Sequence, residues 1–463
     1  MDLPISLPRD LTSSAARVVE ALIRGGGPVR LLYHIDADGI SSGAIALETL
    51  RRLGMSAHAS PIKYLSEARI GAVLREGYSR VMMVDLGSGY RDLLGEISRK
   101  AALIVVDHHE PAGSPPENFV ELNPHLLGID GSKEISGAGT TAVLYLAATG
   151  SIRLIHLALV GAIGDQQDVG GFAGLNAEFL RTTKELKILE ERTEIRLFGG
   201  PEYPLLLSLE RTLDPYIPGV SGSSAGALAL LEKLGIEPKT NGDWTRLSDL
   251  TDRQRRALLS EIIKRMLSAG QEVSPESLIG PAYTLLSEPR GSPLRDLRSF
   301  ATLLNACGRT GRAAVGVALA LGARGSLLER AMSALADYRR EIARALDSTP
   351  TDEVGELLIL RGDRSGVPDT VIGAVTSIVA RSKPSLLVVV GVARDSEDPS
   401  ILKVSARLTR SGQEAGLDLN SLVREAAESA GGSGGGHRSA AGAYIPSKAR
   451  EEFLTALIRG LRK

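Results

Sequence analysis

Residues 104–111 read IVVDHHEP, and this stretch decides the fold of the first part of the chain. Its apolar half, residues 104–106, is predicted to end a buried strand, and Asp107, His108 and His109 follow at once. Burying such ionisable groups without partners is unfavourable. A metal ion would compensate, because carboxylates and neutral imidazoles are natural metal ligands. The rest of the sequence decides whether a metal ion is bound here and what it does.

The rest of the first 180 residues repeats this pattern of a short apolar run followed by a helical stretch. The predicted buried strands are residues 29–35, 80–86 and 101–106. Helical patterns alternate with them at residues 41–53, 66–76 and 90–99. This rhythm predicts a doubly wound α/β domain with a mainly parallel sheet. Ligands of such a sheet bind beyond the carboxyl ends of its strands.

Acids and histidines follow each predicted strand and one apolar helix, residues 152–164. They are His34, Asp36, Asp38, Asp85, Asp107, His108, His109 and Asp165. A single Asp after a strand is commonly a helix cap or a turn residue, but four acid-bearing ends in one domain predict a metal site. Two ions would need one acid to bridge them. Imidazoles without thiolates favour manganese, with magnesium as the alternative, over a structural zinc site.

The second half of the chain has a different composition. Residues 178–300 are charged, helix-rich and interrupted by Pro and Gly, and we expect them to extend the first domain. A helical pattern at 326–346 predicts a connecting helix. Strands at 355–361, 385–393 and 401–408, a Gly-rich loop at 431–437 and a final helix at 447–461 predict a smaller α/β domain. The expected domains are residues 1–325, 326–348 and 349–463.

Composition sets limits on the partners and the compartment. The chain has 463 residues, of which 43% are hydrophobic and 24% charged, as in an ordinary globular protein. No apolar run is long enough to cross a bilayer, so we expect no membrane partner. One cysteine suits a reducing cytoplasm. The net charge is −1, so a nucleic acid would have to be held by a local basic patch.

Four motifs resemble, in this order, those of the DHH phosphoesterase superfamily: HIDADG (34–39), VDLG (84–87), DHH (107–109) and GAIGD (161–165). The segment GGGHRSAAG (434–442) resembles the substrate-binding motif of the DHH-associated domain. Residues 300–319, FATLLNACGRTGRAAVGVAL, resemble the archaeal RecJ-like exonucleases. Some of these are called GINS-associated nucleases and are related to a subunit of the eukaryotic replicative helicase.

The resemblance assigns roles to the residues of the first domain. It implies that Asp36 and Asp38 bind the metals and that Asp85 bridges them, while His108 and Asp165 complete the set. His34 would be a ligand or a neighbour of one. Asp107 would orient an imidazole, and His109 would face the scissile phosphate.

The resemblance also assigns substrate contacts. It places Arg407 near a substrate phosphate, and Gly435 and Gly436 would let backbone amides approach an anion, unless they form only a flexible turn. His437 would donate to the phosphate or hold a base. Two arginines near the connecting helix, Arg309 and Arg312, are candidate contacts to backbone phosphates, or a solvated surface pair.

The implied activity is metal-dependent hydrolysis of phosphodiester bonds in single-stranded DNA or RNA by an exonuclease of replication or repair. Eight cationic residues of the second half suit a long single strand: Arg339, Arg340, Arg344, Arg381, Lys383, Lys403, Arg407 and Arg410. One alternative is an oligoribonuclease or a hydrolase of dinucleotides and cyclic dinucleotides. A second is a replisome scaffold that binds GINS. The intact motif acids oppose a scaffold without catalysis, but a nuclease can also bind GINS and the replicative helicase.

Overall fold

The computed structural model of the protein describes residues 5–271 and 273–461, without the side chains of Glu276 and His437. The chain forms two compact units. The first unit consists of residues up to Ser208, Trp244–Asp249 and Ile279–Leu335. The second unit consists of Leu209–Asp243, Leu250–Leu278 and the residues from Ala336 on. No described helix is both long enough and apolar enough to span a lipid bilayer.

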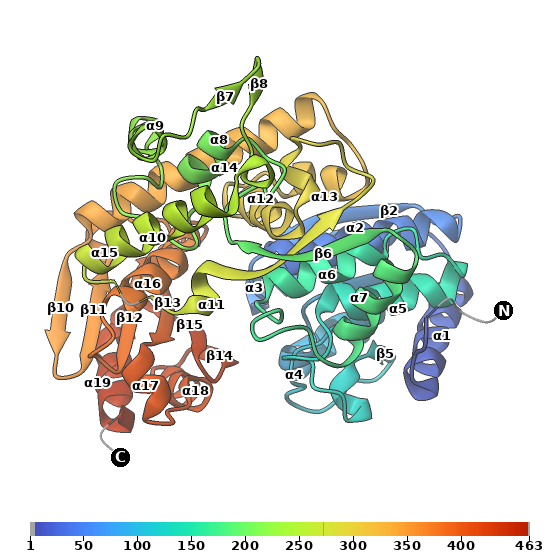
Figure 1. The fold of residues 1–463 in the computed structure, drawn as a ribbon. Coiled ribbons are helices and arrows are strands. Elements are labelled where there is room, and N and C mark those ends of the chain that lie inside the picture. Colours follow the sequence, from blue (N-terminus) through green and yellow to red (C-terminus); the bar gives the residue numbers. More distant parts are fainter. Residues whose placement is uncertain (1–4, 272, 462–463) are drawn as a thin grey trace. The chain divides into compact units, whose positions relative to one another are not determined.

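A five-stranded parallel sheet organises the first unit, in the blue to cyan part of the ribbon (Figure 1). Its strands are β1 (Val29–His34), β2 (Ala57–Ile62), β3 (Arg80–Val84), β4 (Ala102–Val106) and β5 (Phe119–Leu122). Their order is β2-β1-β3-β4-β5. Tyr33, Val84 and Val106 lie in register, so β1, β3 and β4 end together at one edge. The strand order reverses beside β1, which makes this edge a topological switch point.

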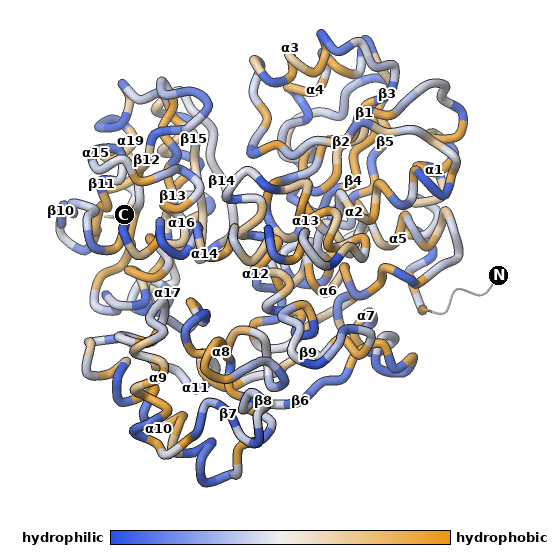
Figure 2. The backbone as a smooth tube through the Cα atoms, turned by 90° about the horizontal axis from the view of Figure 1, so that it is seen from above, coloured by the Kyte–Doolittle hydropathy of each residue, from blue (hydrophilic) through white to orange (hydrophobic). Residues whose placement is uncertain are grey.

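Helices cover both faces of this sheet. They are α1 (Arg9–Arg24), α2 (Ala37–Arg52), α3 (Glu67–Arg75), α4 (Arg91–Ser98), α5 (Gly137–Thr149), α6 (Ile155–Gly164) and α7 (Gly174–Glu185). Apolar residues of α3 and α4 pack on Leu32, Met83 and Val105 of the strands. Helices α5 and α6 are apolar on nearly every side, which is typical of buried helices. In Figure 2, where apolar residues are orange, the colour follows these buried strands and helices.

The remainder of the first unit comes from later in the chain. It contains the antiparallel ribbon of β6 (Leu189–Ile195) and β9 (Ile279–Leu285), with α12 (Leu297–Arg309) and α13 (Ala313–Ala320). Helix α8 (Leu205–Arg211), the short strands β7 (Lys239–Thr240) and β8 (Asp243–Trp244), and the connecting helix α14 (Ser326–Ser348) lie where the chain passes between units.

The division into units differs from the expected extension of the first domain by residues 178–300. The helices α9 (Ser224–Lys233), α10 (Asp252–Ser268) and α11 (Pro275–Leu278) belong to the second unit. Contacts inside that unit explain the difference, because Leu213 packs on the cluster around Ile342 and Val371. Asp214 also forms an ion pair with Arg381 at 2.5 Å.

A six-stranded sheet of order β10-β11-β12-β13-β15-β14 organises the second unit. Its strands are β10 (Thr351–Val354), β11 (Leu357–Arg361), β12 (Val388–Arg394), β13 (Ile401–Leu408), β14 (Ser433–His437) and β15 (Ala440–Pro446). Its helices are α15 (Gly362–Ser365), α16 (Asp369–Ser382), α17 (Arg410–Glu414), α18 (Leu419–Ser429) and α19 (Arg450–Leu461). The α/β architecture predicted for both parts of the chain is confirmed.

The expectation of a Gly-rich loop at 431–437 is wrong. Most of this segment is the edge strand β14, paired with β15 through Gly435 and Gly442. A glycine strand fits here because α18 lies close to it: a Cβ atom on Gly434 would be 3.0 Å from the Cβ atom of Ala427.

Candidate metal centre

The turn from β1 into α2 carries the first two acids. Asp36 caps α2, because its side chain accepts a hydrogen bond from the backbone amide of Gly39 at 2.9 Å. The other carboxylate oxygen of Asp36 lies 2.8 Å from Nδ1 of His34, the last residue of β1. Asp36 therefore has a capping oxygen and an oxygen that faces the end of the sheet.

Asp38 is held by the N-terminus of another helix. Its two carboxylate oxygens accept hydrogen bonds from the first amides of α5, those of Gly137 at 2.7 Å and Ala138 at 2.9 Å. A helix N-terminus favours a negative charge in this place. Gly161 of α6 leaves room for the carboxylate, since a Cβ atom there would lie 2.0 Å from Oδ1 of Asp38.

Asp85 directly follows β3 and has a left-handed backbone, with φ of 59°. This conformation is uncommon outside glycine and tends to occur at functional sites. Its Oδ1 atom lies 3.3 Å from Nε2 of His108, and its Oδ2 atom lies 3.7 Å from Nδ1 of His34. Each oxygen of this buried carboxylate therefore faces a different histidine.

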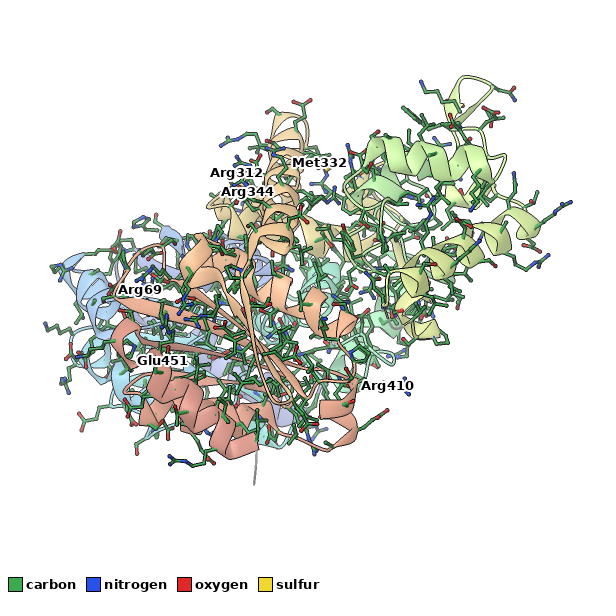
Figure 3. The ribbon with its side chains drawn as sticks, turned by 90° about the vertical axis from the view of Figure 1, so that its left-hand side faces the viewer. Arg69, Arg312, Met332, Arg344, Arg410 and Glu451 are labelled. Atoms are coloured by element: carbon green, nitrogen blue, oxygen red, sulfur yellow. The ribbon has the colours of Figure 1, made fainter. Side chains whose placement is uncertain are left out.

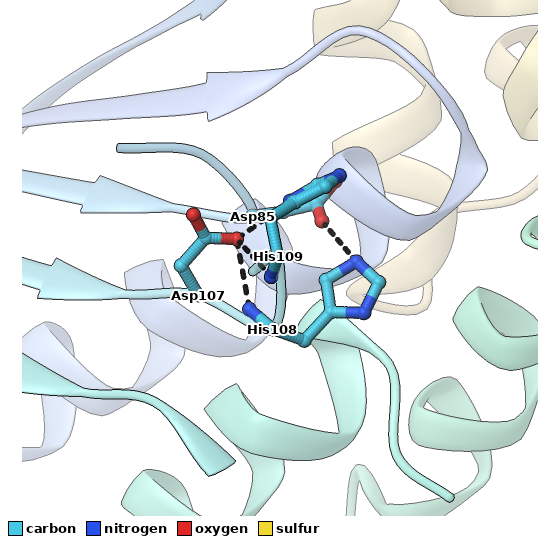
Figure 4. A group of neighbouring side chains, drawn as sticks. All are labelled: Asp85, Asp107, His108 and His109. Atoms are coloured by element: carbon cyan, nitrogen blue, oxygen red, sulfur yellow. Dashed lines mark hydrogen bonds and ion pairs between the residues drawn. The ribbon is translucent and has the colours of Figure 1, made fainter. Parts of the chain in front are cut away.

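His108 points its Nε2 atom at the carboxylate of Asp85 (Figure 4). Its Nδ1 atom lies 2.7 Å from the carbonyl oxygen of Gly131. A carbonyl only accepts hydrogen bonds, so Nδ1 must carry the proton. In the neutral ring Nε2 then has a free lone pair, and it lies 3.3 Å from Asp165, at the end of α6, and 3.6 Å from Asp38.

Asp107 is occupied by hydrogen bonds and orients its neighbours. Its Oδ1 atom accepts from the backbone amides of His108 and His109 and from Nδ1 of His109, at 2.8, 3.3 and 2.8 Å. Its Oδ2 atom accepts from the amide of Ser88 at 2.9 Å. The imidazole of His109 is 49% exposed, and Asp107 fixes its Nδ1 side (Figure 4).

The charges of the group perturb each other strongly. Burial, and then the charge of Asp85, raise the pKa of Asp38 to about 7. Burial and the charge of Asp38 likewise raise the pKa of Asp165. Burial opposes the charged form of His34, but Asp36 outweighs it and raises the pKa of His34 to about 10. This cluster of carboxylates therefore favours the binding of additional positive charge, as protons or as a cation.

The residues present fit divalent cations. Oδ1 of Asp85 and Nε2 of His108 are buried, and neither has a hydrogen-bond partner of regular geometry among the described residues. Candidate ligand atoms lie within 4.8 Å of one another in two sets: His34, Asp36 and Asp85, and Asp38, His108 and Asp165. Mixed carboxylate and imidazole ligands suit a borderline divalent ion. Asp107 belongs to a further set, but its oxygens are already used.

Helix α12 supports the first acid-bearing turn. Asn305 accepts a hydrogen bond from the amide of Ala37 at 2.9 Å. A Cβ atom on Gly308 would lie 1.6 Å from the carbonyl oxygen of Ile35, so the helix backbone packs directly on the turn. The pKa of Asp36 is lowered, because the charge of His34, helped by Arg309, outweighs burial. Sequence reasoning singled out this segment, including Arg309, but missed Asn305.

Arg312 follows α12 in the first unit and is labelled in Figure 3. Its charge acts on the buried thiol of Cys307, where burial dominates and raises the pKa to about 12. The role of Arg312 as a phosphate contact stays a prediction.

The predicted substrate residues of the second unit lie on β13 and β14. Arg407 donates from Nε to the hydroxyl of Ser377 at 2.9 Å and from Nη1 to the carbonyl of Ala406 at 2.8 Å. The amide of Gly436 donates to Oδ1 of Asn420 at 3.0 Å, and a role of Gly435 and Gly436 in binding an anion stays a prediction. The side chain of His437 lies outside the described part of the chain.

Four of the eight cations expected to hold a long strand form ion pairs with acidic side chains. Ion pairs join Arg340 to Asp337, Arg344 to Glu341, Arg381 to Asp214 and Arg410 to Glu414. Arg344 and Arg410 are labelled in Figure 3. Because most of these guanidinium groups are already partly neutralised, the basic surface is weaker than the sequence alone indicates.

Three family models match successive parts of the chain. They are the DHH family N-terminal domain at residues 28–161, the DHH-CID domain at 197–278 and the DHHA1 domain at 356–463. The chain belongs to the DHH superfamily. The resemblance found in the sequence motifs is thus confirmed, and the candidate metal centre lies in the part that matches the DHH family N-terminal domain and just after it.

Similar proteins come from archaea, bacteria and eukaryotes. The chain is 28% identical to the uncharacterized protein MJ0831 of Methanocaldococcus jannaschii, over 96% of each chain. It is 28% identical to the single-stranded-DNA-specific exonuclease RecJ of Thermus thermophilus over 192 residues, which are 39% of this chain and 28% of RecJ.

Solved structures share the fold. RecJ of Thermus thermophilus in complex with Mn²⁺ superposes with a TM-score of 0.55 and 20% identity, over 98% of this chain and 55% of RecJ. CDC45 of Entamoeba histolytica superposes with a TM-score of 0.60 and 12% identity, over 98% of this chain and 99% of CDC45. This chain is therefore a RecJ-like member of the superfamily that spans about half the length of RecJ.

Proposed function

We propose that the protein is a metal-dependent exonuclease that hydrolyses phosphodiester bonds of single-stranded DNA or RNA. The observation that carries the proposal is the carboxylate of Asp85, whose two oxygens face two separate sets of ligand atoms. This geometry supports a bridging carboxylate between two divalent ions, for which manganese is the first candidate and magnesium the second.

The two sets divide the ligands. His34 and Asp36 would hold one ion, and Asp38, His108 and Asp165 the other, with Asp85 shared. When bound, divalent ions supply charge neutralisation at the phosphate and lower the pKa of a water molecule at the site. Three of these side chains are held in place without a metal ion. Asp36 and Asp38 each accept a hydrogen bond from a backbone amide, and His108 donates one to a backbone carbonyl.

His109 is proposed as the catalytic proton donor. Burial lowers its pKa, but the carboxylate of Asp107 outweighs burial and raises it. With Nδ1 bound to Asp107, the proton on Nε2 of the charged ring is directed away from Asp107, on a half-exposed side chain. It can therefore donate to a phosphoryl oxygen or to the leaving oxygen.

Single-stranded nucleic acid is favoured as the substrate by the similarity to RecJ, whose name specifies single-stranded DNA. Arg309 and Arg312 in the first unit, and Arg407 with the β14 strand in the second, are the proposed phosphate contacts. Aromatic residues are only 4% of the chain, so base stacking contributes little to binding. A hydrolase of dinucleotides or cyclic dinucleotides uses the same centre and is the alternative.

End-labelled single-stranded DNA and RNA, incubated with Mn²⁺ or EDTA, test the proposal. We expect stepwise shortening with Mn²⁺, loss of it with EDTA, and loss of it in Asp85→Asn, a substitution that keeps the shape and tolerates the left-handed backbone. The matched control is Asp347→Asn, at an exposed acid of α14, which should cleave as the wild type does. Cleavage of dinucleotides alone would favour the alternative, and no cleavage of any of these would contradict the proposal.

The similarity to CDC45 over nearly the whole of both chains supports a second role, binding to GINS and the replicative helicase. This role is compatible with catalysis. Co-purification of GINS with the tagged full chain, repeated with Asp85→Asn, tests it. Retention of GINS by both proteins is expected, and its absence from both would contradict the role.

A further inference from the structure

A chain of hydrogen bonds leads from α7 to the buried histidine of the centre. Nδ2 of Asn176 donates to Oε1 of Gln167 at 2.6 Å and to the carbonyl oxygen of Lys133 at 3.3 Å. Nε2 of Gln167 donates to the carbonyl oxygen of Gly131 at 2.9 Å. That oxygen is the one that accepts the Nδ1 proton of His108.

The direction of every bond in this chain is fixed. The carbonyl oxygens of Lys133 and Gly131, at its two ends, only accept hydrogen bonds. Both side-chain amides must therefore present their NH₂ groups as described, because a reversed Gln167 would place two acceptor oxygens 2.9 Å apart. The carbonyl of Gly131 receives two donors, one from Gln167 and one from His108.

The backbone around Gly131 is closely packed, so its carbonyl group has little freedom to move away from His108. A Cβ atom on Gly131 would lie 2.0 Å from the carbonyl oxygen of His108, so the two backbones are in direct contact. The amide of Asn176 also donates to the carbonyl of Glu134 at 2.8 Å, which ties the same loop to α7. Gln167 and Asn176 are 7% and 0% exposed, so water does not compete effectively for these bonds.

We propose that Gln167 and Asn176 are positioning residues that hold the Gly131 carbonyl against Nδ1 of His108, and so keep Nε2 of His108 directed at Asp38, Asp85 and Asp165. This inference rests on the proposed function only in that the centre binds divalent cations. Partners that orient a ligand histidine through its second nitrogen commonly change metal affinity 10- to 100-fold when they are lost.

Two variants of the full chain test the inference. Gln167→Met keeps the size of the side chain but removes the donor to Gly131, and Gln167→Leu also removes it without adding a group that can donate a hydrogen bond. The matched control is Thr183→Val on α7, which removes a buried hydroxyl that donates to the carbonyl of Phe179 at 2.9 Å, with no described link to His108. The measurements are Mn²⁺ affinity by calorimetry and the visible absorption spectrum of Co²⁺ bound to each protein.

We expect Mn²⁺ affinity about 10- to 100-fold weaker in both Gln167 variants, with a changed Co²⁺ spectrum, while Thr183→Val matches the wild type in both. If Gln167→Met does not fold, Gln167→Leu and the control decide the outcome. Wild-type affinity and spectrum in a folded Gln167 variant would overturn the inference, as would equal losses in the control. Neither measurement uses catalysis, so a protein that binds Mn²⁺ as expected but cleaves no nucleic acid refutes the proposed function and leaves this inference standing.

Discussion

Gly161→Ala replaces a hydrogen atom with a methyl group directly against the carboxylate of Asp38. In a free helix position the substitution stabilises a helix by about 1 kcal/mol. Here the new Cβ atom would lie 2.0 Å from Oδ1 of Asp38 and 2.5 Å from the Cβ atom of Ala138, so Asp38 or α5 must move. Hydrogen bonds to a charged group contribute about 1.5–3 kcal/mol each. Losing both amide bonds to Asp38 costs about 3–6 kcal/mol, for a net loss near 2–5 kcal/mol.

The assay compares urea unfolding of the metal-free proteins at pH 8 and their Mn²⁺ affinity by calorimetry. We expect an earlier unfolding midpoint for Gly161→Ala and at least tenfold weaker binding, since a ligand has left its place. The control is Gly95→Ala in α4, where the nearest described atom, Nη1 of Arg99, would be 3.9 Å from the new Cβ atom. It should unfold at the same or a higher urea concentration and bind Mn²⁺ normally.

A Gly161→Ala protein with the wild-type midpoint and wild-type Mn²⁺ affinity would refute the reasoning. Asp38 would then not depend on the space that Gly161 leaves for its carboxylate. A lower midpoint with unchanged affinity would show that Asp38 is structural and not a ligand.

Three further results are expected. Because burial and neighbouring carboxylates raise the pKa values of Asp38 and Asp165, protons compete with metal, and Mn²⁺ affinity should fall as the pH is lowered from 8 to 6, by up to about tenfold per unit for each proton displaced. The metal-free protein should become more stable as the pH is lowered over the same range, because Asp38 holds its proton more firmly when folded, and the stability that this provides is lost as the pH rises through its pKa of about 7. Calorimetry in buffers of different ionisation enthalpy, and urea midpoints, check both signs. His109→Asn should lower kcat about 10²- to 10⁴-fold with unchanged Mn²⁺ affinity, and a loss of affinity would make it a ligand. Asn305→Ala leaves the amide of Ala37 without its acceptor and should cost about 1–3 kcal/mol in urea unfolding, whereas an unchanged midpoint would exclude a supporting role.

The strands that carry the centre could be predicted from sequence because each is a continuous apolar run with an acid at its end. The runs at 29–35, 80–86 and 101–106 correspond to β1, β3 and β4 within one or two residues. The outer strands β2 and β5 were not predicted. β2 is only half buried and contains Pro61, and β5 has four residues, so neither has a clear apolar signature.

Contacts between distant residues were beyond sequence patterns. Gly161 packs against Asp38, and Gln167 donates a hydrogen bond to Gly131. Both contacts join residues that are far apart in the sequence, and no motif or periodic pattern relates them. The Gly-rich segment shows the opposite error, because glycine usually marks a turn, whereas β14 is extended where α18 and β15 leave no room for side chains. Local composition therefore predicted the wrong backbone conformation for this segment.

The anchoring of the first acid-bearing turn has a consequence for protein synthesis. Asp36 and Asp38 leave the ribosome early, but Asp38 acquires its amide donors only with Gly137 and Ala138, and Ala37 acquires its acceptor only with Asn305. The two carboxylates of this turn are therefore synthesised before the groups that hold them, and the turn can reach its complete set of contacts only after residue 305 has been synthesised.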